Sequence, residues 1–554
     1  MWWITAAQAL TLDAAVVGTE VTIEITGASP SASVKLLAST LGEGPGPCPA
    51  ALGGTCVDLQ RVDRVVTLST DASGQASVLV PAPALDTLWL QAVQVGPVEL
   101  SPVVELSLVP QVVSLACDPH ADNVLRYDCT VGLDRPAAAE LEWLDGLGEP
   151  VVERSDASEQ LEHAFAVWGM WADDTFTVRA RGGTGDPAII EVTTDPLPVG
   201  PDLDLAVSGS TEAGPFLFNM GCDGTDELVV VDGVGRVRWY QDVADLSPGA
   251  MVSRGFELTP HGTVLVLVDR YEVAELAFDG TLLWSTPVAD PLHHEVLWWG
   301  DKVAAIDARA VAFPNGLTYV MDGVQWFDGQ GSPLSYFPHE DVVDPQVVTG
   351  GGGYWNPVFS GAIDWAHVNA LAMGDDGTGV LSLKAIDALH KVVLDPDAPD
   401  FGDLVWTLTG KAGSPLVSDL ARLSSTGVTP ITFGDQHHIT VLADDELLFL
   451  DNQPGGSQLS RVLRVVVDEV AGTADLVESW PLNRRCPGQG SAVLLDSGNV
   501  IADCAAADTL LEIEAATGAE LWSMTASCPS GVTPPRPLYR ALVVDGWSAV
   551  TSPR

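Results

Sequence analysis

A tryptophan ends a strand-like segment six times beyond residue 202. A strand and a turn precede each segment, so one unit recurs at intervals of 45, 42, 80, 74 and 42 residues. The six tryptophans are Trp239, Trp284, Trp326, Trp406, Trp480 and Trp522. All-β units of about 40–50 residues with a periodic aromatic residue are typical of β-propellers. The spacing predicts a six-bladed β-propeller over residues 202–554, with insertions in the middle units and the tryptophans packed between blades.

The residues before this repeat have the pattern of smaller β domains. Residues 10–109 contain about seven short alternating segments between turns rich in Gly, Pro and Ser, as in an immunoglobulin-like sandwich. Residues 110–197 repeat the pattern, and Pro196–Pro201 reads as a linker. We therefore expect an all-β chain, with two immunoglobulin-like β-sandwich domains followed by a six-bladed β-propeller.

The chain is strongly acidic, with 75 Asp and Glu against 25 Lys and Arg. A surface this negative repels phosphate backbones, so no nucleic-acid partner is expected. No apolar run reaches the roughly 18 residues of a transmembrane helix, so no membrane span is expected. Residues 1–9 are apolar and end in Ala-Gln-Ala, a small-x-small pattern. We interpret them as the remnant of a signal segment or as a first strand.

Eight cysteines and no C-x-x-C argue against a zinc ribbon or a redox motif. Short loops closed by cysteines in an all-β chain indicate disulfides formed in an oxidising compartment. Cys222 and Cys528 lie near the two ends of the repeat region, where ring closure could bring them together. The cysteines predict an exported protein, periplasmic or extracellular. Three close pairs are the disulfide candidates: Cys48 with Cys56, Cys117 with Cys129, and Cys486 with Cys504.

Three histidine islands begin predicted strands in three different units: His293-His294, His367 and His437-His438. In a propeller the corresponding ends of equivalent strands converge on the central channel, so these islands can meet. With Lys384 they would form a cationic pocket. Two chemistries suit it: a metal site of imidazoles, or nucleophilic catalysis on an anionic group by one imidazole. The isolated His120, His163 and His390 are interpreted as ordinary surface or core residues.

An ordered series of motifs spans these islands. It comprises His-His-Glu (293–295), Asp-Trp-x-His-x-Asn (364–369), Ser-x-Lys (382–384), Phe-x-x-Gln-His-His (433–438), Phe-Leu-Asp-Asn (449–452) and Ser460-Arg461. The series resembles the PAPS-independent bacterial arylsulfotransferases over residues 202–554. The resemblance implies an exported six-bladed propeller with an N-terminal β-sandwich. It also implies transfer of a sulfuryl group from an aryl sulfate donor to a phenolic acceptor through a sulfohistidine, with neither nucleotide nor metal.

The resemblance assigns a role to each site residue. His437 matches the histidine that becomes sulfated, and His367 matches one that assists the phenol oxygen or the sulfuryl oxygens. Either His293 or His294 matches the third histidine, and we favour His294, which stands beside the acidic residue. The arginine of the family falls on Lys384, a point charge in place of a planar fork. The implied reaction is ping-pong, and the oligomeric state is open.

Two other functions remain open from the sequence. Thr517-Gly518 followed by Trp522 resembles the repeat of quinone-cofactor propellers, but only this copy is complete. An exported binding or adhesion protein with a degenerate site is the non-catalytic alternative, since Lys384 departs from the family pattern. Retention of all three histidine islands favours the enzyme.

Overall fold

The computed structural model describes residues 9–83, 85–144, 150–155, 160–246, 252–343, 345, 353–410, 424–425, 431–443, 445–452, 459–532 and 538–544. Within these ranges the regular structure is β-strand and short 3-10 turns, without an α-helix, which confirms the all-β prediction. The same ranges hold no helix of the length and hydropathy that a membrane crossing requires. The signal-like segment lies, except for Ala9, outside the described residues. The 3-10 turns are η1 (Ala50–Leu52), η2 (Val243–Asp245), η3 (His339–Asp341), η4 (Lys384–Ile386) and η5 (Ala505–Ala507).

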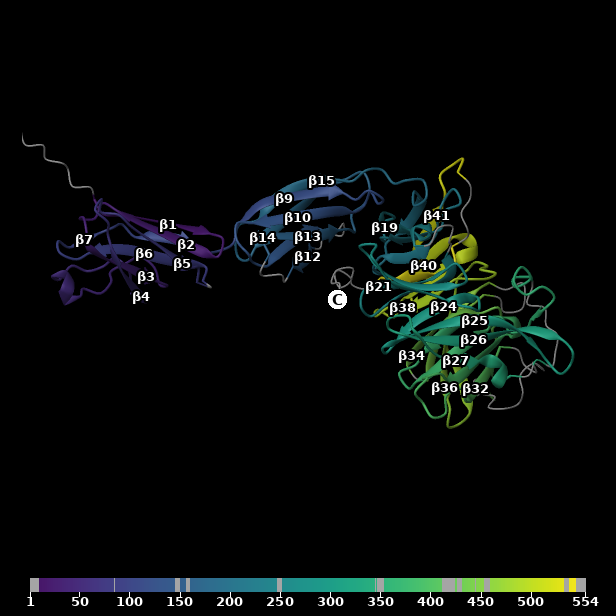
Figure 1. The fold of residues 1–554 in the computed structure, drawn as a ribbon. Helices are drawn as coiled ribbons and strands as arrows, with labels where there is room; N and C mark the ends of the chain where they lie inside the picture. The colour runs from purple at the N-terminus through teal and green to yellow at the C-terminus, as the bar shows by residue number, and fades with distance from the viewer. Residues whose placement is uncertain are drawn as a thin grey trace, which may run out of the picture. The chain divides into compact units, whose positions relative to one another are not determined.

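The chain forms two compact units (Figure 1). Unit 1 comprises residues 1–119, 127–167 and 175–193, and unit 2 comprises residues 120–126, 168–174 and 194–554.

In the part of unit 1 that the structure describes there are four antiparallel sheets, whose strands are named in order across each sheet. The first is β1 (Thr11–Val17), β2 (Glu20–Thr26) and β5 (Ala76–Pro81). The second is β4 (Arg64–Ser69), β3 (Ser33–Ser39), β6 (Thr87–Gln94) and β7 (Glu99–Leu100), with β8 (Val104–Ser107) beside β6. The third is β13 (Glu162–Val167), β10 (Tyr127–Leu133) and β9 (Val112–Pro119). The fourth is β12 (Pro150–Ser155), β11 (Ala139–Leu144), β14 (Thr175–Gly182) and β15 (Ala188–Thr193).

Alternation along the strands builds the core of unit 1. In β2 the buried residues are Val21, Ile23 and Ile25, every second position, because successive side chains of a strand point to opposite faces. These residues share one hydrophobic cluster with Val34 and Leu36 of β3, so the first two sheets enclose a common core. Disulfides join Cys48 with Cys56 and Cys117 with Cys129, as the cysteine spacing indicates.

The described residues of unit 2 form six sheets, numbered along the chain, with the strands of each named from the innermost outward. Sheet 1 is β42 (Ala541–Val543), β17 (Phe216–Asn219), β18 (Glu227–Val231) and β19 (Val237–Asp242); sheet 2 is β20 (Val252–Leu258), β21 (Thr263–Val268), β22 (Glu272–Ala277) and β23 (Leu282–Pro287). Sheet 3 is β24 (Leu292–Trp299), β25 (Lys302–Ala312), β26 (Thr318–Asp328) and β27 (Pro333–Pro338), with β28 (Ile363–Asp364) beside β26; sheet 4 is β29 (Val368–Met373), β30 (Thr378–Leu383), β31 (Ala388–Val393) and β32 (Leu404–Thr409). Sheet 5 is β34 (His437–Ala443), β35 (Glu446–Asp451), β36 (Arg461–Asp468), β37 (Thr473–Pro481) and β33 (Ser424–Ser425); sheet 6 is β38 (Ala492–Leu494), β39 (Val500–Cys504), β40 (Thr509–Ile513), β41 (Glu520–Ser527) and β16 (Asp204–Gly209).

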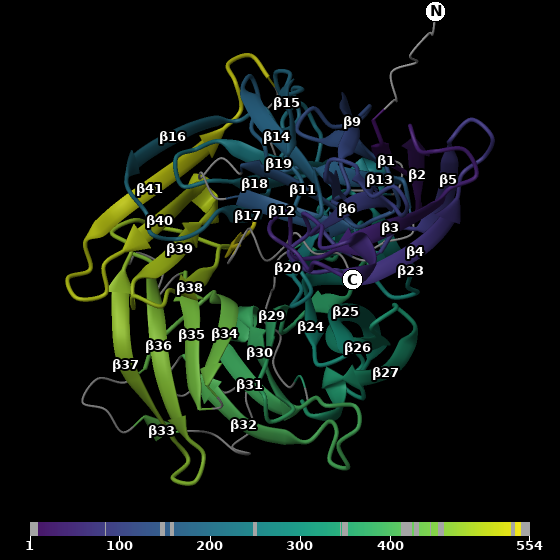
Figure 2. The same cartoon turned by 90° about the vertical axis from the view of Figure 1, so that its left-hand side faces the viewer.

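The six sheets follow one another around a common centre (Figure 2). Their innermost strands, β20, β24, β29, β34, β38 and β42, all contribute side chains to one cavity. Hydrogen bonds link neighbours at this centre: Asn369 of sheet 4 donates to Gln436 O beside sheet 5, and Ser491 Oγ beside sheet 6 donates to Ala541 O of sheet 1. The beginnings of the inner strands therefore meet, which is the convergence expected of the histidine islands.

The two ends of unit 2 are tied to each other. Strand β16, the first of the unit, pairs with β41 of the last sheet, and β42, near the C-terminus, pairs with β17 of the first. A disulfide joins Cys222 with Cys528, 306 residues apart. This exchange of strands connects sheets 6 and 1, as the sequence suggested for these two cysteines.

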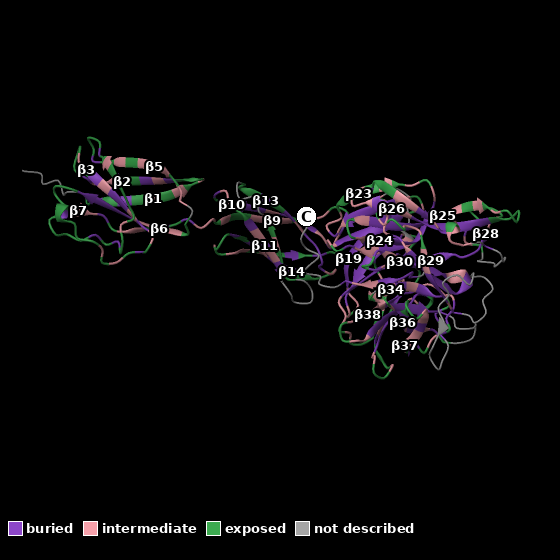
Figure 3. Cartoon of the chain, turned by 90° about the horizontal axis from the view of Figure 1, so that it is seen from below, coloured by how far each residue is buried: buried purple, intermediate pink, exposed green. Residues whose placement is uncertain are grey.

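The recurring tryptophans lie between sheets, as predicted. Trp239, Trp406, Trp480 and Trp522 each stand on the fourth strand of a sheet and donate the indole N–H to the turn between the third and fourth strands of the next sheet. Trp326 differs in its place in the sheet, since it lies near the end of β26, the third strand of sheet 3. Ser335 of β27 pairs with it across the strands. Burial is concentrated in the strands of unit 2 (Figure 3).

Candidate active site

A cavity of about 480 Å³ opens where the inner strands of sheets 2 to 5 begin. It contains four of the five predicted site residues: His294, His367, Lys384 and His437. The fifth, His293, is completely buried and does not line the cavity. The other lining residues, which the motifs do not identify, are Arg254, Pro487, Gly488, Gln489, Ala506 and Asp508.

Bulges in the inner strands direct the side chains of the site into the cavity. The strand register shifts at or next to Arg254 in β20 and at or next to the histidine island in β24, β29 and β34. Arg254, His294, His367 and His438 have φ of 77°, 63°, 52° and 47°, which is uncommon for residues other than glycine. Bulges redirect side chains and are frequent beside active sites. The same device therefore recurs in four successive sheets. The sequence signal that could identify Arg254 is its place in the repeat, because it occupies in sheet 2 the bulge position that the histidines occupy in the next sheets.

The hydrogen bonds of His437 define its tautomer. Nδ1 lies 2.9 Å from Asp435 O and 2.9 Å from Asn452 Oδ1, both of which accept, so Nδ1 carries the proton. Nε2 accepts a bond of 3.2 Å from the backbone N–H of Gln489, so it carries the lone pair. Burial, followed by the charge of Lys384, lowers the pKa of His437 to about 3. The ring is therefore neutral near pH 7, with its unprotonated nitrogen at the cavity.

Asn452 fixes His437 against the segment that closes the cavity. Its Nδ2 donates to Cys486 O at 2.9 Å and to Gln489 O at 2.7 Å. Cys486 forms a disulfide with Cys504, at the end of β39. This disulfide joins the segment containing Gln489 to the one containing Asp508, both of which line the cavity. Asn452 of the Phe-Leu-Asp-Asn motif thus holds both His437 and the segment opposite it in place.

A carboxylate orients His367. Its Nδ1 donates to Asp364 Oδ2 at 2.8 Å, which leaves Nε2 as the nitrogen available to a substrate. Its carbonyl accepts from the backbone N–H of Lys384 at 3.3 Å, so the backbone holds this histidine and lysine together.

His293 supports His294 from the protein interior. His293 Nε2 donates to Asp307 O at 3.3 Å and lies 3.1 Å from Asp322 Oδ1, so it carries a proton. Its Nδ1 then accepts from His294 Nδ1, 2.7 Å away. The Nε2 of His294 is left unprotonated, and burial together with the positive charges around it keeps the pKa of His294 well below its usual value.

Two tyrosine rings pack beside His294, at that end of the site. The ring centroids of Tyr354 and Tyr539 lie 5.6 and 5.8 Å from that of His294. Arg254 places its guanidinium carbon 5.0 Å from the Tyr354 centroid and 5.7 Å from that of Tyr539. Flat aromatic faces and cations together suit an aromatic guest with negative charge.

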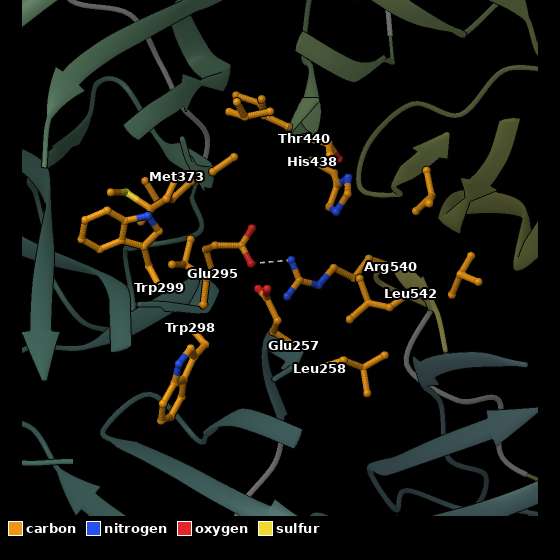
Figure 4. Close-up of a pocket in the computed structure, with 17 residues that line it drawn as sticks. Glu257, Leu258, Glu295, Trp298, Trp299, Met373, His438, Thr440, Arg540 and Leu542 are labelled. Atoms are coloured by element: carbon orange, nitrogen blue, oxygen red, sulfur yellow. Dashed lines mark hydrogen bonds and ion pairs between the residues drawn. The ribbon is translucent and has the colours of Figure 1, made fainter. Parts of the chain in front are cut away.

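A second cavity, of about 320 Å³, follows the centre of the six sheets (Figure 4). Its polar residues include Glu257, His438 and the ion pair between Glu295 and Arg540. Burial raises the pKa of Glu257 to about 8 and lowers that of His438 to about 3. His438 therefore faces this cavity and not the one that holds His437. In the described part of the chain no group of three or more His, Cys, Asp or Glu is arranged to hold a metal ion.

The family model for arylsulfotransferase (ASST) matches residues 205–524, more than half of the chain. The protein therefore belongs to the arylsulfotransferase family, which confirms the resemblance drawn from the motifs. Members of this family are sulfotransferases, and the family implies aryl sulfates and phenols as substrates.

Solved structures resemble the chain only weakly, and no curated protein matches it. A Bacteroides caccae protein of unknown function is 11% identical over 60% of this chain and 100% of its own, with a TM-score of 0.35. BamB from Moraxella catarrhalis is 14% identical over 58% and 78%, with a TM-score of 0.26. Virginiamycin B lyase from Staphylococcus aureus is 9% identical over 59% and 89%, with a TM-score of 0.28. At these scores the likenesses support no argument about activity.

Proposed function

We propose that the protein is an aryl-sulfate sulfotransferase that carries the sulfuryl group on His437. The observation behind the proposal is the state of this ring: Nδ1 is held by two acceptors, and the unprotonated Nε2, which accepts from the Gln489 N–H at 3.2 Å, lies at a cavity lined by Lys384. A neutral buried imidazole beside a lysine suits attack on an anionic electrophile.

In the first half-reaction His437 Nε2 gives up its hydrogen bond from the Gln489 N–H and forms a bond to sulfur, while the bond from sulfur to the aryl oxygen breaks. The leaving aryloxide takes the Nε2 proton of His367 in its imidazolium form, which Asp364 stabilises. Lys384 neutralises the sulfuryl oxygens as charge shifts among them. Asn452 and Asp435 O hold the Nδ1 proton of the sulfated ring, which becomes positive.

In the second half-reaction a phenol replaces the aryloxide. Its proton passes to His367, its oxygen attacks sulfur, and the bond from sulfur to nitrogen breaks. His437 returns to its neutral state and the product aryl sulfate leaves. The scheme is ping-pong and consumes no nucleotide.

The proposal extends to the architecture. We propose that the six sheets of unit 2 are the blades of a six-bladed β-propeller over residues 202–554. Two immunoglobulin-like sandwiches, residues 10–109 and 110–197, would precede it. Four disulfides are consistent with an exported protein, periplasmic or extracellular.

The test is incubation of the oxidised protein with sulfur-35 4-nitrophenyl sulfate, with and without phenol. We expect release of nitrophenolate and, without phenol, label on His437. His437→Ala should abolish both.

His438→Asn is the matched control, because it changes the neighbouring histidine, which faces the other cavity, and because Asn tolerates positive φ. It should retain the label. Label that persists in His437→Ala would exclude His437 as the nucleophile. An absence of nitrophenolate release from the wild type would favour the non-catalytic alternative.

A further inference from the structure

Arg254 has no role in the reaction scheme, yet it lines the reactive cavity. It is the residue of sheet 2 at the position where sheets 3 and 4 supply His294 and His367. Its φ of 77° is unfavourable for a side chain of this size, and such backbone persists where the surroundings enforce it, often at functional sites.

The charge of Arg254 is not neutralised by the described part of the protein, where it forms no ion pair with Asp or Glu. Other arginines there, such as Arg238, Arg461 and Arg540, each pair with a carboxylate. Acidic residues outnumber basic ones by 75 to 25 in this chain, so carboxylates are abundant elsewhere. A guanidinium left beside a cavity under these conditions is available to an anionic ligand.

A second arginine reinforces this side of the cavity. Arg270, from the turn between β21 and β22, places its guanidinium carbon 4.7 Å from the Tyr354 centroid. Its Nη1 is buried without a hydrogen-bond partner among the described residues. Two guanidinium carbons thus lie within 5.0 Å of the centroid of one tyrosine ring, and two cations gathered on one ring favour an anion nearby.

The position of Arg254 separates it from the sulfuryl group. His437 belongs to sheet 5 and Arg254 to sheet 2, three places apart in six sheets arranged around one centre. They therefore stand on opposite sides of the cavity. Lys384 is the cation whose charge acts most on His437, whereas the charge of Arg254 acts on His294.

One carboxyl of the described residues also lines the cavity. Asp508, between β39 and β40 of sheet 6, accepts from Leu538 N through Oδ1 at 3.0 Å. Burial raises the pKa of this carboxyl, which weakens its repulsion of an anionic guest. The permanent charges at the described lining of the cavity, Arg254 and Lys384, are positive.

We infer that Arg254, with Arg270 behind it, forms a second anion subsite, and that the preferred substrates are phenols and aryl sulfates carrying a carboxylate remote from the reacting oxygen. The inference rests on the proposed function, because it takes the reacting oxygen to lie at His437. The aromatic ring then crosses the cavity beside Tyr354 and Tyr539, and the carboxylate meets Arg254.

The test compares two acceptors of nearly the same shape, 4-hydroxyphenylacetate and 4-hydroxyphenylacetamide, with 4-nitrophenyl sulfate as donor. The wild type should prefer the acid by about tenfold or more in kcat/KM, as expected of a charge-assisted hydrogen bond. Arg254→Asn, a residue that tolerates positive φ, should bring the ratio close to one. Higher ionic strength should reduce the ratio in the wild type.

Arg464→Gln is the matched control, since this arginine pairs with Glu446 and Glu478 within sheet 5 and does not line the cavity. It should keep the wild-type ratio. A wild-type ratio near one, or an unchanged ratio in Arg254→Asn, would overturn the inference and leave the proposed function intact. Turnover with phenol but with neither of these acceptors would also overturn the inference, whereas no turnover with any acceptor means that the proposed function fails. Calorimetric affinities of the same two compounds for wild type and Arg254→Asn then decide the inference alone.

Discussion

Replacement of Asn452 by Leu tests how the protein controls its nucleophile. Asn452 is completely buried, and its Oδ1 is one of two acceptors for the Nδ1 proton of His437. Sulfation makes the ring positive, and a hydrogen bond to a charged group contributes about 1.5–3 kcal/mol. Asp435 O remains as the other acceptor, so the lower part of this range applies. Since about 1.36 kcal/mol is tenfold in rate, we expect sulfation to slow by roughly 10–30-fold.

The measurement is the burst of nitrophenolate from 4-nitrophenyl sulfate in rapid mixing. The burst rate should fall while its amplitude still reports one site per chain. The contact with Asn452 raises the pKa of His437, so its removal shifts the pKa further below about 3. The ring therefore stays neutral from about pH 5 to 8 in both proteins, and over that range His437 contributes no pH dependence. In the wild type this nucleophile is lost only as the pH falls toward about 3.

Asn315→Leu is the control, because it removes an amide contact, to Tyr319, outside the cavity. A burst rate for Asn452→Leu within about threefold of the wild type, in a folded protein, would refute the positioning role of Asn452.

Three further outcomes are expected. Glu257→Gln should stabilise unit 2 relative to the wild type as the pH rises from about 5 to 8, by up to about 4 kcal/mol. The reason is that only the folded state keeps this carboxyl protonated above its ordinary pKa of 4.5. Thermal scans at both pH values measure the difference in stability, and a difference that does not change with pH would contradict the prediction. Replacing Cys486 and Cys504 together by Ser should destabilise unit 2 by about 2–4 kcal/mol in denaturant titrations. It should also lower turnover, since their disulfide connects two segments of the cavity. Unchanged turnover would show that the disulfide does not support the site. Asp364→Asn should lower kcat about 10–100-fold by removing the charge that supports His367, and a shift in KM alone would argue against that role.

Local patterns predicted the elements of the fold well. Alternating residues marked the strands, and a recurring tryptophan marked the interval between sheets, because each of these features depends on a few neighbouring residues. The exception, Trp326, shows the limit. A strand ending in Trp has the same pattern on the third strand of a sheet as on the fourth, and only pairing with β27 distinguishes them.

The site was predicted in part. His294, His367, Lys384 and His437 belong to motifs with several residues in a fixed order. Arg254 has no such context, and neither do Tyr354 and Tyr539, whose rings lie beside His294; nothing near these residues in the sequence indicates that they come together. Their association is produced by sheets that are far apart along the chain.

The sequence by itself determined the all-β class, the recurring unit, the cysteines able to pair at short range and the family. The tertiary structure decided which histidine of the pair 293–294 faces the cavity: the bulge of β24 turns His294 into it, and His293 stays inside beside Asp322. It also decided that Arg254 stands across the cavity from His437. A sequence pattern records spacing along one chain, whereas both of these relations arise from backbone direction and from the closing of six sheets around one centre.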